Sequence, residues 1–510
     1  MLQNLFLNID AGTIDWSRAQ FALTAIYHWL FVPLTLGLAV IMGIVETKYY
    51  RTKDPFWKDA AKFWQKLFGI NFAMGVATGI ILEFEFGTNW SNYSWFVGDI
   101  FGAPLAVEGI VAFFMESTFV AVMFFGWKKV SPGFHLASTW LTGLGATISA
   151  WWILVANAWM QYPVGCEFNP DTMRNEMVSF AEVALSPFAV SKFCHTVTSA
   201  WIIGAIFCVG VCCWYLLKKR ETKLAVESMK IGAAVGLVAS LLAAATGHKS
   251  AQDVAAVQPM KLAAMEALYD GGNGIGLKVI EGIEVPNALS FMATNDFEGY
   301  VPGVNDILNG YTKPDGQVEP SVDEKIERGK KAIAALAAYR KAKHEGAEDS
   351  TINQQLSLLN ENMPYFGYGY IRNKEEVVPP IAVNFWAFRV MVGLGGLFIL
   401  FFAVVLAGAY GWPKALWRDR SITGLPNWHY WIAIALIPLA YIASESGWLV
   451  AEFGRQPWTI QDMLPTWAAV SDLQSSSVMI TFFLFLILFT TMLAVEINIM
   501  LKQIKKGPQL

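Results

Sequence analysis

Charged side chains are scarce in this sequence. Asp, Glu, Lys and Arg make up 15% of its 510 residues, whereas hydrophobic residues make up 55%. Soluble domains carry about 25% charged residues, and a soluble chain of this length would divide into several such domains. The shortage of charge therefore excludes an ordinary soluble protein. The net charge of −4 says little about partners, and no nucleic acid is expected among them.

Cysteine is also scarce. Four of the five cysteines (Cys194, Cys208, Cys212 and Cys213) fall in long apolar segments, and only Cys166 falls outside them. Neither a disulfide framework nor a zinc site is therefore predicted. The first 18 residues lack the basic start and apolar stretch of a cleavable signal peptide, so none is expected.

Long apolar runs are what the sequence has in abundance. A stretch of roughly 20 apolar residues spans a bilayer core of about 30 Å as a helix, because lipid offers no hydrogen-bond partner to an open backbone. The sequence predicts an all-α, multi-pass membrane protein with nine such helices: 19–46, 67–86, 101–126, 136–160, 187–217, 229–247, 382–410, 428–451 and 474–501.

The distribution of Lys and Arg predicts the orientation of these helices. The segments 48–66, 127–134, 218–230, 411–427 and 502–510 hold 19 Lys and Arg residues, and the alternate short segments hold 3. By the positive-inside rule, the N-terminus lies outside and the C-terminus lies in the cytoplasm.

Three parts follow along the chain. Residues 1–247 carry the first six membrane helices, 248–381 form a long outer segment, and 382–510 carry the last three. Within the outer segment, 249–268 is predicted to be a short amphipathic helix near the surface. The Gly- and Pro-rich stretch 270–320 is predicted to be irregular, and 321–346 to be a charged, solvated helix.

Four side chains that can bind a metal share one depth in the predicted membrane. His28, Glu108, His195 and Met391 lie seven to nine residues from the outer ends of helices that run in the same direction. At 1.5 Å per residue, they lie roughly 10–14 Å below the outer surface. His and Met form a common axial pair for a low-spin haem, and a second His could hold another haem.

Each of these residues also has a structural explanation. A lone membrane His is more often a hydrogen-bond partner of another helix than a ligand, and a lone Met usually packs. The spacing alone leaves two alternatives open, haem binding and a transporter with buried polar sites.

Other buried charges fit either alternative. Glu116 lies eight residues beyond Glu108 and faces broadly the same way, which suits a proton relay towards the cytoplasm. Lys192 and Arg389 stand beside His195 and Met391, where they could pair with haem propionates or extend to the interface.

Nine segments together resemble a known family. They resemble cytochrome bd quinol oxidase subunit I, from about residue 15 to 500 except for the middle of the outer segment: SRAQFALTAIYHWLFVPLTLG (17–37), KLFGINFAMGVATG (66–79), EFGTNWS (85–91), GDIFGAPLAVEGIVAFFMESTF (98–119), ILVANAWMQYP (153–163), KFCHT (192–196), QPMKLAAMEA (258–267), FWAFRVM (385–391) and GWLVAEFGRQPW (447–458).

The resemblance implies three haems and their ligands. His195 and Met391 match the axial ligands of a low-spin haem b. His28, Glu108 and Glu452 match ligands of two high-spin haems, a haem b and a haem d, without an assignment of each residue to one haem.

The resemblance also implies roles for residues around the haems. Lys261 and Glu266 match quinol-site residues, in what is similar to the long form of the family's Q-loop. Glu116 matches a carboxylate on the proton route, and Trp448 and Arg455 match the surroundings of the high-spin haems.

The function implied is that of a bacterial terminal oxidase in the cytoplasmic (inner) membrane. Quinol would be oxidised at the outer face and dioxygen reduced to water with cytoplasmic protons, which generates a membrane potential without pumping. The implied partners are a second large membrane subunit and a small single-helix subunit. The rivals are a transporter, which would show discontinuous helices and inverted repeats, and an electron-transfer cytochrome without oxygen chemistry.

Overall fold

Nine membrane-length helices are present in the part of the chain that the structure describes. This computed structural model describes residues 10–280, 282–412 and 422–508. Each predicted span lies inside one of these helices, apart from one residue at an end of 101–126 and of 474–501, which confirms the predicted fold class. Several helices extend well beyond the predicted span, and α3 begins 12 residues before it. The helices are α2 (Ala11–Thr52), α3 (Pro55–Thr88), a third helix in three parts (α5, Asp99–Val107; η1, Glu108–Phe113; α6, Phe114–Phe125), α7 (Pro132–Gln161), α9 (Pro187–Leu217), α10 (Thr222–Val257), α16 (Ile381–Tyr410), α18 (Asn427–Phe453) and α20 (Ser475–Lys506).

Several helices begin at a capping residue followed by proline. Asp54 accepts a hydrogen bond from the backbone N–H of Phe56 at 2.9 Å, and Ser186 accepts one from Ala189 at 3.1 Å. Proline at the first helical position loses no hydrogen bond, because that N–H has no partner within the helix. These caps fix where α3 and α9 enter the bundle.

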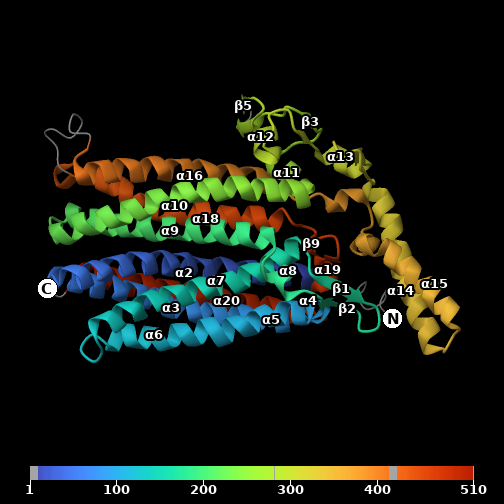
Figure 1. Ribbon diagram of the computed structural model, residues 1–510, viewed down its shortest axis with the longest axis horizontal. Coiled ribbons are helices and arrows are strands. Elements are labelled where there is room, and N and C mark those ends of the chain that lie inside the picture. Colours follow the sequence, from blue (N-terminus) through green and yellow to red (C-terminus); the bar gives the residue numbers. More distant parts are fainter. Residues whose placement is uncertain (1–9, 281, 413–421, 509–510) are drawn as a thin grey trace.

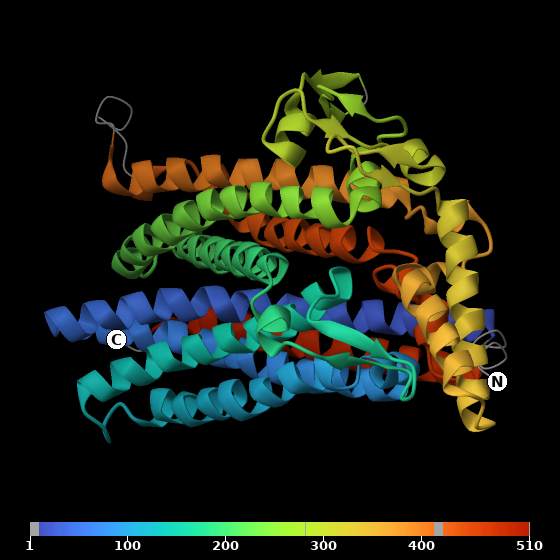
Figure 2. The same cartoon turned by 45° about the vertical axis from the view of Figure 1, so that its right-hand side comes forward.

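The helices form two groups that lie side by side (Figures 1 and 2). In one group, α9 packs on α10 and α18, and α16 packs on α10 and α18; in the other, α2 packs on α3, α7 and α20. Helices α2 and α9 join the groups at a close crossing. A Cβ at Gly37 would lie 2.6 Å from the Cα of Gly204, so only glycine permits this approach.

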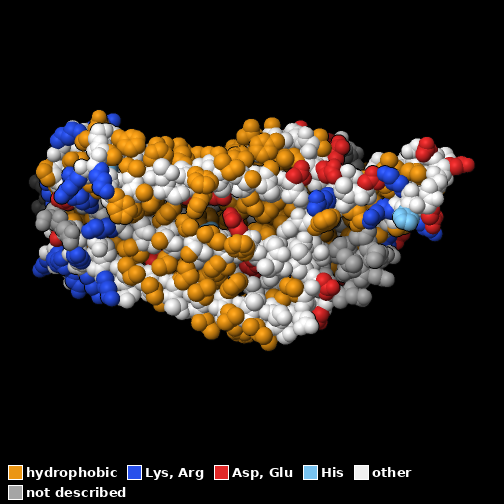
Figure 3. Space-filling view, turned by 90° about the horizontal axis from the view of Figure 1, so that it is seen from below, with side chains coloured by type: hydrophobic (Ala, Val, Ile, Leu, Met, Phe, Trp, Pro, Cys, Tyr) orange, Lys and Arg blue, Asp and Glu red, His pale blue; other side chains and the backbone are white. Residues whose placement is uncertain are grey.

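Charge is distributed unevenly between the two ends of the bundle. Figure 3 shows Lys and Arg gathered at the end opposite the long outer segment, with a hydrophobic belt between the ends. The predicted orientation is consistent with this asymmetry and stays a prediction. Most of the loop 411–427, which contributes three of the counted basic residues, lies outside the described residues.

The third membrane helix departs from regular α-helical geometry. A six-residue π-helix, Glu108–Phe113, separates α5 from α6. The prediction that Glu108 and Glu116 face broadly the same way assumed an uninterrupted α-helix, and that premise is wrong, although both side chains line the same cavity. Such π-helical turns are frequent at functional sites.

The long outer segment differs from its prediction at its start. Residues 249–257 continue α10, and a separate eight-residue helix, α11 (Pro259–Glu266), follows. The prediction of one surface helix over 249–268 is therefore wrong, because Gln258 ends α10 and Pro259 begins α11. All of α11 from Lys261 to Glu266 is buried.

The rest of the outer segment consists of short elements and two longer helices. The charged helix is confirmed as α14 (Val322–His344), whereas α15 (Asp349–Asn362) was not predicted. The stretch predicted to be irregular holds only short pieces: β3 (Gly272–Asn273), β4 (Leu277–Ile280), β5 (Ile283–Val285), α12 (Ala288–Thr294), β6 (Tyr300–Val301), α13 (Val304–Asn309), β7 (Tyr311–Thr312) and β8 (Val318–Glu319).

The remaining described elements are short, and most of them cap the end of the bundle at which residues 248–381 lie. They are α4 (Ser91–Val97), β1 (Cys166–Asn169), β2 (Arg174–Met177), α8 (Phe180–Ala184), η2 (Met363–Tyr370), η3 (Lys374–Val377), β9 (Trp458–Ile460), β10 (Leu464–Pro465) and α19 (Thr466–Ala469); η4 (Ile422–Gly424) lies at the opposite end. The strands pair as antiparallel two-stranded ladders: β1 with β2, β3 with β6, β4 with β5, β7 with β8 and β9 with β10.

Candidate functional site

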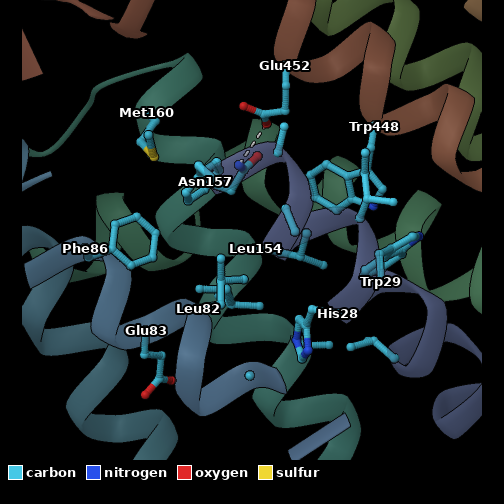
Figure 4. Close-up of a pocket in the computed structure, with 18 of the residues that line it drawn as sticks. His28, Trp29, Leu82, Glu83, Phe86, Leu154, Asn157, Met160, Trp448 and Glu452 are labelled. Carbon is cyan, nitrogen blue, oxygen red and sulfur yellow. Dashed lines mark hydrogen bonds between the residues drawn. The ribbon is translucent and has the colours of Figure 1, made fainter. Parts of the chain in front are cut away.

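A cavity of about 900 Å³ lies between α2, α3, the third helix, α7 and α18. This volume is at the upper end of the range for small-molecule sites, about 300–1,000 Å³. The cavity brings together six residues that the sequence analysis selected: His28, Glu108, Glu116, Trp448, Glu452 and Arg455. Figure 4 shows His28 and Glu452 at opposite sides of it, with Trp29 and Trp448 along one flank.

His28 is held with one ring nitrogen engaged. Its Nδ1 lies 3.0 Å from Oγ1 of Thr78, and that hydroxyl donates its own proton to the backbone of Met74 or Gly75. Thr78 can therefore only accept from His28, so Nδ1 carries the proton. Nε2 is then the nitrogen with a free lone pair, the arrangement of a metal-ligating histidine.

Glu108 and Glu116 lie on the same wall of the cavity. Ser149 on α7 donates a hydrogen bond to Oε1 of Glu108 at 2.7 Å. Glu116 packs against α7 where a glycine leaves room: a Cβ at Gly145 would lie 2.6 Å from Cγ of Glu116. The two carboxyl groups thus stand at successive levels of one wall, at and beyond the π-helix.

Glu452 is the centre of a cluster with excess positive charge. Its Oε2 accepts a hydrogen bond from Nη2 of Arg455 at 2.5 Å, and its Oε1 accepts one from Asn157 at 3.0 Å. Lys192 donates to the same Asn157. Nε and Nη1 of Arg455 are buried without a partner. Buried charges need compensation, so this cluster is built to receive further anionic groups.

His195 and Met391 do not line this cavity but lie in the helix group formed by α9, α10, α16 and α18. They are carried by α9 and α16, which α10 and α18 connect. Nδ1 of His195 lies 3.1 Å from the backbone carbonyl of Ala243, so it carries the proton and Nε2 is left as the acceptor. Cofactor sites in helical bundles are commonly built from side chains on facing helices.

A glycine lies beside each of the three nitrogen and sulfur ligand candidates. A Cβ at Gly79 would lie 3.0 Å from Cε1 of His28, and one at Gly247 would lie 3.1 Å from Cε1 of His195. A Cβ at Gly447 would lie 3.1 Å from Sδ of Met391. The neighbouring helices thus leave space at all three side chains.

Lys261 points from the outer segment into the bundle. Its Nζ donates to Oε1 of Gln161 at 2.6 Å, Gln161 donates to Asn157 at 3.0 Å, and Asn157 donates to Glu452. Burial lowers the pKa of Lys261 well below its ordinary value, with a further lowering by the charge of Lys192. Lys261 is therefore joined by hydrogen bonds to the large cavity.

Lys261 also borders a second cavity of about 530 Å³, which residues of the long segment 248–381 and Arg455 line as well. Gln258 accepts a hydrogen bond from Lys261 and donates one to Gln461, which donates to Asp462. Burial raises the pKa of Asp462. A continuous hydrogen-bonded chain thus connects the two cavities.

Glu266 occupies a different environment from Lys261. Its Oε2 accepts a hydrogen bond from Nη2 of Arg389 on α16 at 2.6 Å, and its Oε1 is buried without a partner. Burial raises the pKa of Glu266 to about 7, although the Arg389 hydrogen bond and the charge of Lys278 act in the opposite direction. A carboxyl with this pKa can take up and release a proton near neutral pH.

The structure adds polar residues that sequence reasoning missed. Asn157 and Gln161 lie four residues apart on α7, a spacing that places both on one face, and this pattern could have indicated them. At the opposite end of the bundle, Oε1 of Glu46 lies 2.6 Å from Nδ1 of His135, and Gln65 donates to its Oε2. The Glu46–His135 pair was overlooked because both residues lie at predicted span ends.

Comparison with known proteins decides the family. The model of the family described as cytochrome bd terminal oxidase subunit I matches residues 16–508. The chain belongs to this family. Among curated relatives it is 40% identical to "Cytochrome bd-II ubiquinol oxidase subunit 1" of Escherichia coli (strain K12), over 97% of each chain. It is 35% identical to "Cytochrome bd ubiquinol oxidase subunit 1" of Bacillus subtilis (strain 168), over 97% of this chain and 94% of the relative.

Two more distant likenesses agree with this assignment. The chain is 25% identical to "Putative cytochrome bd menaquinol oxidase subunit I" of Bacillus subtilis (strain 168), over 96% of each. Its fold matches the structure of bd oxidase from Geobacillus thermodenitrificans with a TM-score of 0.76 and 22% identity, over 97% of this chain and 99% of that one. The terminal oxidase family excludes both rivals, the transporter and the cytochrome without oxygen chemistry.

The residues of this chain fit the haem groups that a cytochrome carries. Two histidines offer a free Nε2, a methionine offers a thioether, and glycines leave room at all three. Haem propionates are carboxylates, and the excess cations with two unpartnered Arg455 nitrogens suit such groups. The donor set is therefore one that haem iron accepts.

Proposed function

We propose that this chain is the haem-bearing subunit of a quinol:oxygen oxidoreductase. It would oxidise quinol at the outer end of the bundle and reduce dioxygen to water. Two relatives are named ubiquinol oxidases, so ubiquinol is the first substrate to test, and menaquinol is the second. The observation that carries the proposal is that His28, Glu108 and Glu452 line one large cavity, which hydrogen bonds connect to Lys261.

The cofactors proposed are two haem b groups, one low-spin and one high-spin, and one haem d. His195 and Met391 would hold the low-spin haem b, and His28, Glu108 and Glu452 would hold the other two. Bound there, the haems would supply electron transfer from quinol and the reduction of dioxygen. Lys192 and Arg455 would pair with propionate groups, and Trp448 would pack beside the high-spin pair.

The outer residues would bind and deprotonate quinol. Lys261 offers N–H donors to a quinol oxygen at the start of the hydrogen-bonded chain. Glu266 would accept a quinol proton through its unpartnered Oε1, while Arg389 holds its other oxygen. The proton would then leave on the outer side.

Glu116 would hold a proton on its way from the opposite end of the bundle towards Glu108. Ser149 would orient Glu108, because its hydroxyl donates to Oε1. Protons of quinol leave on one side, and protons for water enter from the other. The reaction would therefore build a membrane potential without a pump.

The surroundings of the chain complete the proposal. We place it in the bacterial cytoplasmic (inner) membrane, with α2 beginning outside and α20 ending in the cytoplasm, as the gathering of Lys and Arg at one end supports. The relatives are named as subunit 1, which supports a second large membrane subunit as partner. A small single-helix subunit is a further proposed partner.

The proposal is tested by a reduced-minus-oxidised absorbance spectrum of the purified complex, with quinol-driven oxygen uptake on the same sample. A low-spin b band, a red-shifted chlorin band and oxygen uptake are expected. A folded preparation that is colourless, although haem was supplied during its production, would overturn the proposed haem sites. Coloured protein that consumes no oxygen with any quinol would overturn the oxidase function.

A further inference from the structure

A hairpin of the outer segment exposes apolar side chains on both of its faces. Strands β4 and β5 pair antiparallel, and four of their β-branched residues are exposed: Val279, Ile280, Ile283 and Val285. A two-stranded hairpin is marginally stable in water, and soluble surfaces rarely gather such residues. A contact with a further apolar phase would explain this composition.

The hairpin is anchored to a membrane helix rather than to the outer loops. Nε of Arg389 on α16 donates to the backbone carbonyl of Lys278 in β4 at 2.9 Å. Leu277 of β4 packs in the same cluster as Phe388 of α16. Figures 1 and 2 both show β5 beside α16 and not beyond its outer end.

Aromatic residues on α16 indicate the depth of this anchor. Trp386 is 56% exposed near the outer end and Tyr410 is 66% exposed at the other. Their separation of 24 residues corresponds to about 36 Å of helix, which matches a bilayer core of about 30 Å with its interfacial edges. Arg389 lies three residues nearer the centre than Trp386, so β4 contacts α16 at the level of the outer interface or just below it.

We propose that the β4–β5 hairpin lies at the outer interface of the bilayer, where its exposed Val and Ile side chains contact lipid acyl chains and its exposed Lys278 and Glu284 stay among the polar headgroups. The lipid-facing surface of α16, with Val383, Trp386 and Val390 exposed, continues onto the hairpin. The same Arg389 that holds the hairpin also holds Glu266. The hairpin thus forms the lipid-side wall of the Glu266 site. A quinol dissolved in the membrane enters the site past this wall. This second part rests on the proposed function, whereas the lipid contact does not.

Spin labelling of the whole oxidase in vesicles of phosphatidylethanolamine and phosphatidylglycerol tests the lipid contact. A nitroxide is attached at Ile283→Cys in a Cys166→Ser background, because the other four cysteines lie in membrane helices. Val318→Cys in β8 is the matched control: Val318 is an equally β-branched residue, 74% exposed, beside Glu319, which pairs with Lys325 on α14 outside the bundle.

The label at 283 should be relaxed by dissolved oxygen and broadened several-fold less by a water-soluble nickel chelate than the label at 318. Equal nickel broadening at both positions would overturn the inference. A label at 283 shielded from both relaxants would also overturn it, and would show that a protein partner covers the hairpin.

Quinol entry is tested separately with the double variant Ile280→Asp/Ile283→Asp. The KM for long-chain ubiquinol in vesicles should rise several-fold while kcat is retained, and Val318→Asp should change neither. An unchanged KM would overturn the inference that the hairpin borders the entry path of quinol. If the unaltered oxidase consumed no oxygen with quinol, the proposed function would fail, and the spin-label result would still decide the lipid contact.

Discussion

Lys261 and Glu266 lie five residues apart on α11 and point into different surroundings. Lys261 donates to Gln161 within the bundle at 2.6 Å, and Glu266 accepts from Arg389 of α16 at 2.6 Å. Five residues turn an α-helix by about 140° beyond one full turn, so the two side chains cannot share a face. If both act on quinol, they act from two sides of α11.

The pH dependence of quinol oxidation should report the carboxyl of Glu266. Its pKa is raised from the ordinary 4.5 to about 7, so the group is mostly protonated below pH 7 and unable to accept a proton. The value of kcat/KM for quinol should rise with pH up to about 7 and level off above it. Glu266→Gln should abolish this inflection and lower the plateau about 100-fold, in the range of a lost general base.

The exposed Glu298→Gln variant, in the same outer segment, is the control and should keep the profile of the unaltered enzyme. A profile that Glu266→Gln leaves unchanged would assign the proton acceptor elsewhere. The raised pKa of Glu266 also makes the free energy of unfolding depend on pH. The contribution of Glu266 to stability is present below its ordinary pKa and is lost as pH rises through 7.

Gln161→Leu should separate Lys261 from Asn157. The lost hydrogen bond to a buried ammonium is worth about 1.5–3 kcal/mol, so the KM for quinol should rise at least about tenfold with a smaller change in kcat. Gln20→Leu, which removes a buried amide that accepts from Thr481 at 2.8 Å, is the matched control. Steady-state kinetics in vesicles measure both, and equal losses in the two variants would mean general destabilisation instead.

Glu116→Gln should slow oxygen uptake by about 100-fold or more while the haem spectrum is retained. Glutamine fills the same space beside Gly145 but cannot carry a proton. Glu496→Gln on α20, also buried, should leave uptake unchanged because Glu496 does not line the large cavity. Loss of the haem bands in Glu116→Gln would show a structural role and contradict the relay.

The membrane helices could be predicted from sequence because one physical requirement dominates them. Any span must bury about 20 apolar residues with satisfied backbone hydrogen bonds, so the run from 382 to 410 matches α16 to within one residue. The outer segment obeys no such requirement. Water satisfies its backbone, and local turns such as Gln258–Pro259 decide where its helices begin.

The sequence predicted which residue types the candidate site contains better than it predicted the hydrogen bonds and helix contacts between them. His28 and Glu108 stood out because buried ionisable groups are costly, whereas Glu452 was selected through the family resemblance. Asn157 and Gln161 did not stand out, because an uncharged amide costs less to bury than a charged group and so is a weaker signal. The π-helix at Glu108 leaves no pattern in the sequence that periodicity could detect. The different surroundings of Lys261 and Glu266 depend on which helix packs on each side of α11.

Substitutions of the glycines beside the ligand candidates should change one haem signature at a time. Gly447→Ala would place a Cβ 3.1 Å from Sδ of Met391, and Gly79→Ala would place one 3.0 Å from Cε1 of His28. Each side chain must then shift, at a cost of about 1–3 kcal/mol for overpacking. Gly447→Ala should alter the low-spin b band and its midpoint potential, and Gly79→Ala should alter a high-spin band.

Gly393→Ala on α16 is the control for both, because a Cβ there meets nothing within 4 Å. It should leave the spectrum and the potentials unchanged. If Gly447→Ala changed only the high-spin bands, Met391 would not be an axial ligand of the low-spin haem. The same readout separates a ligand from a packing residue, since a methionine that merely packs can shift without changing the coordination of iron.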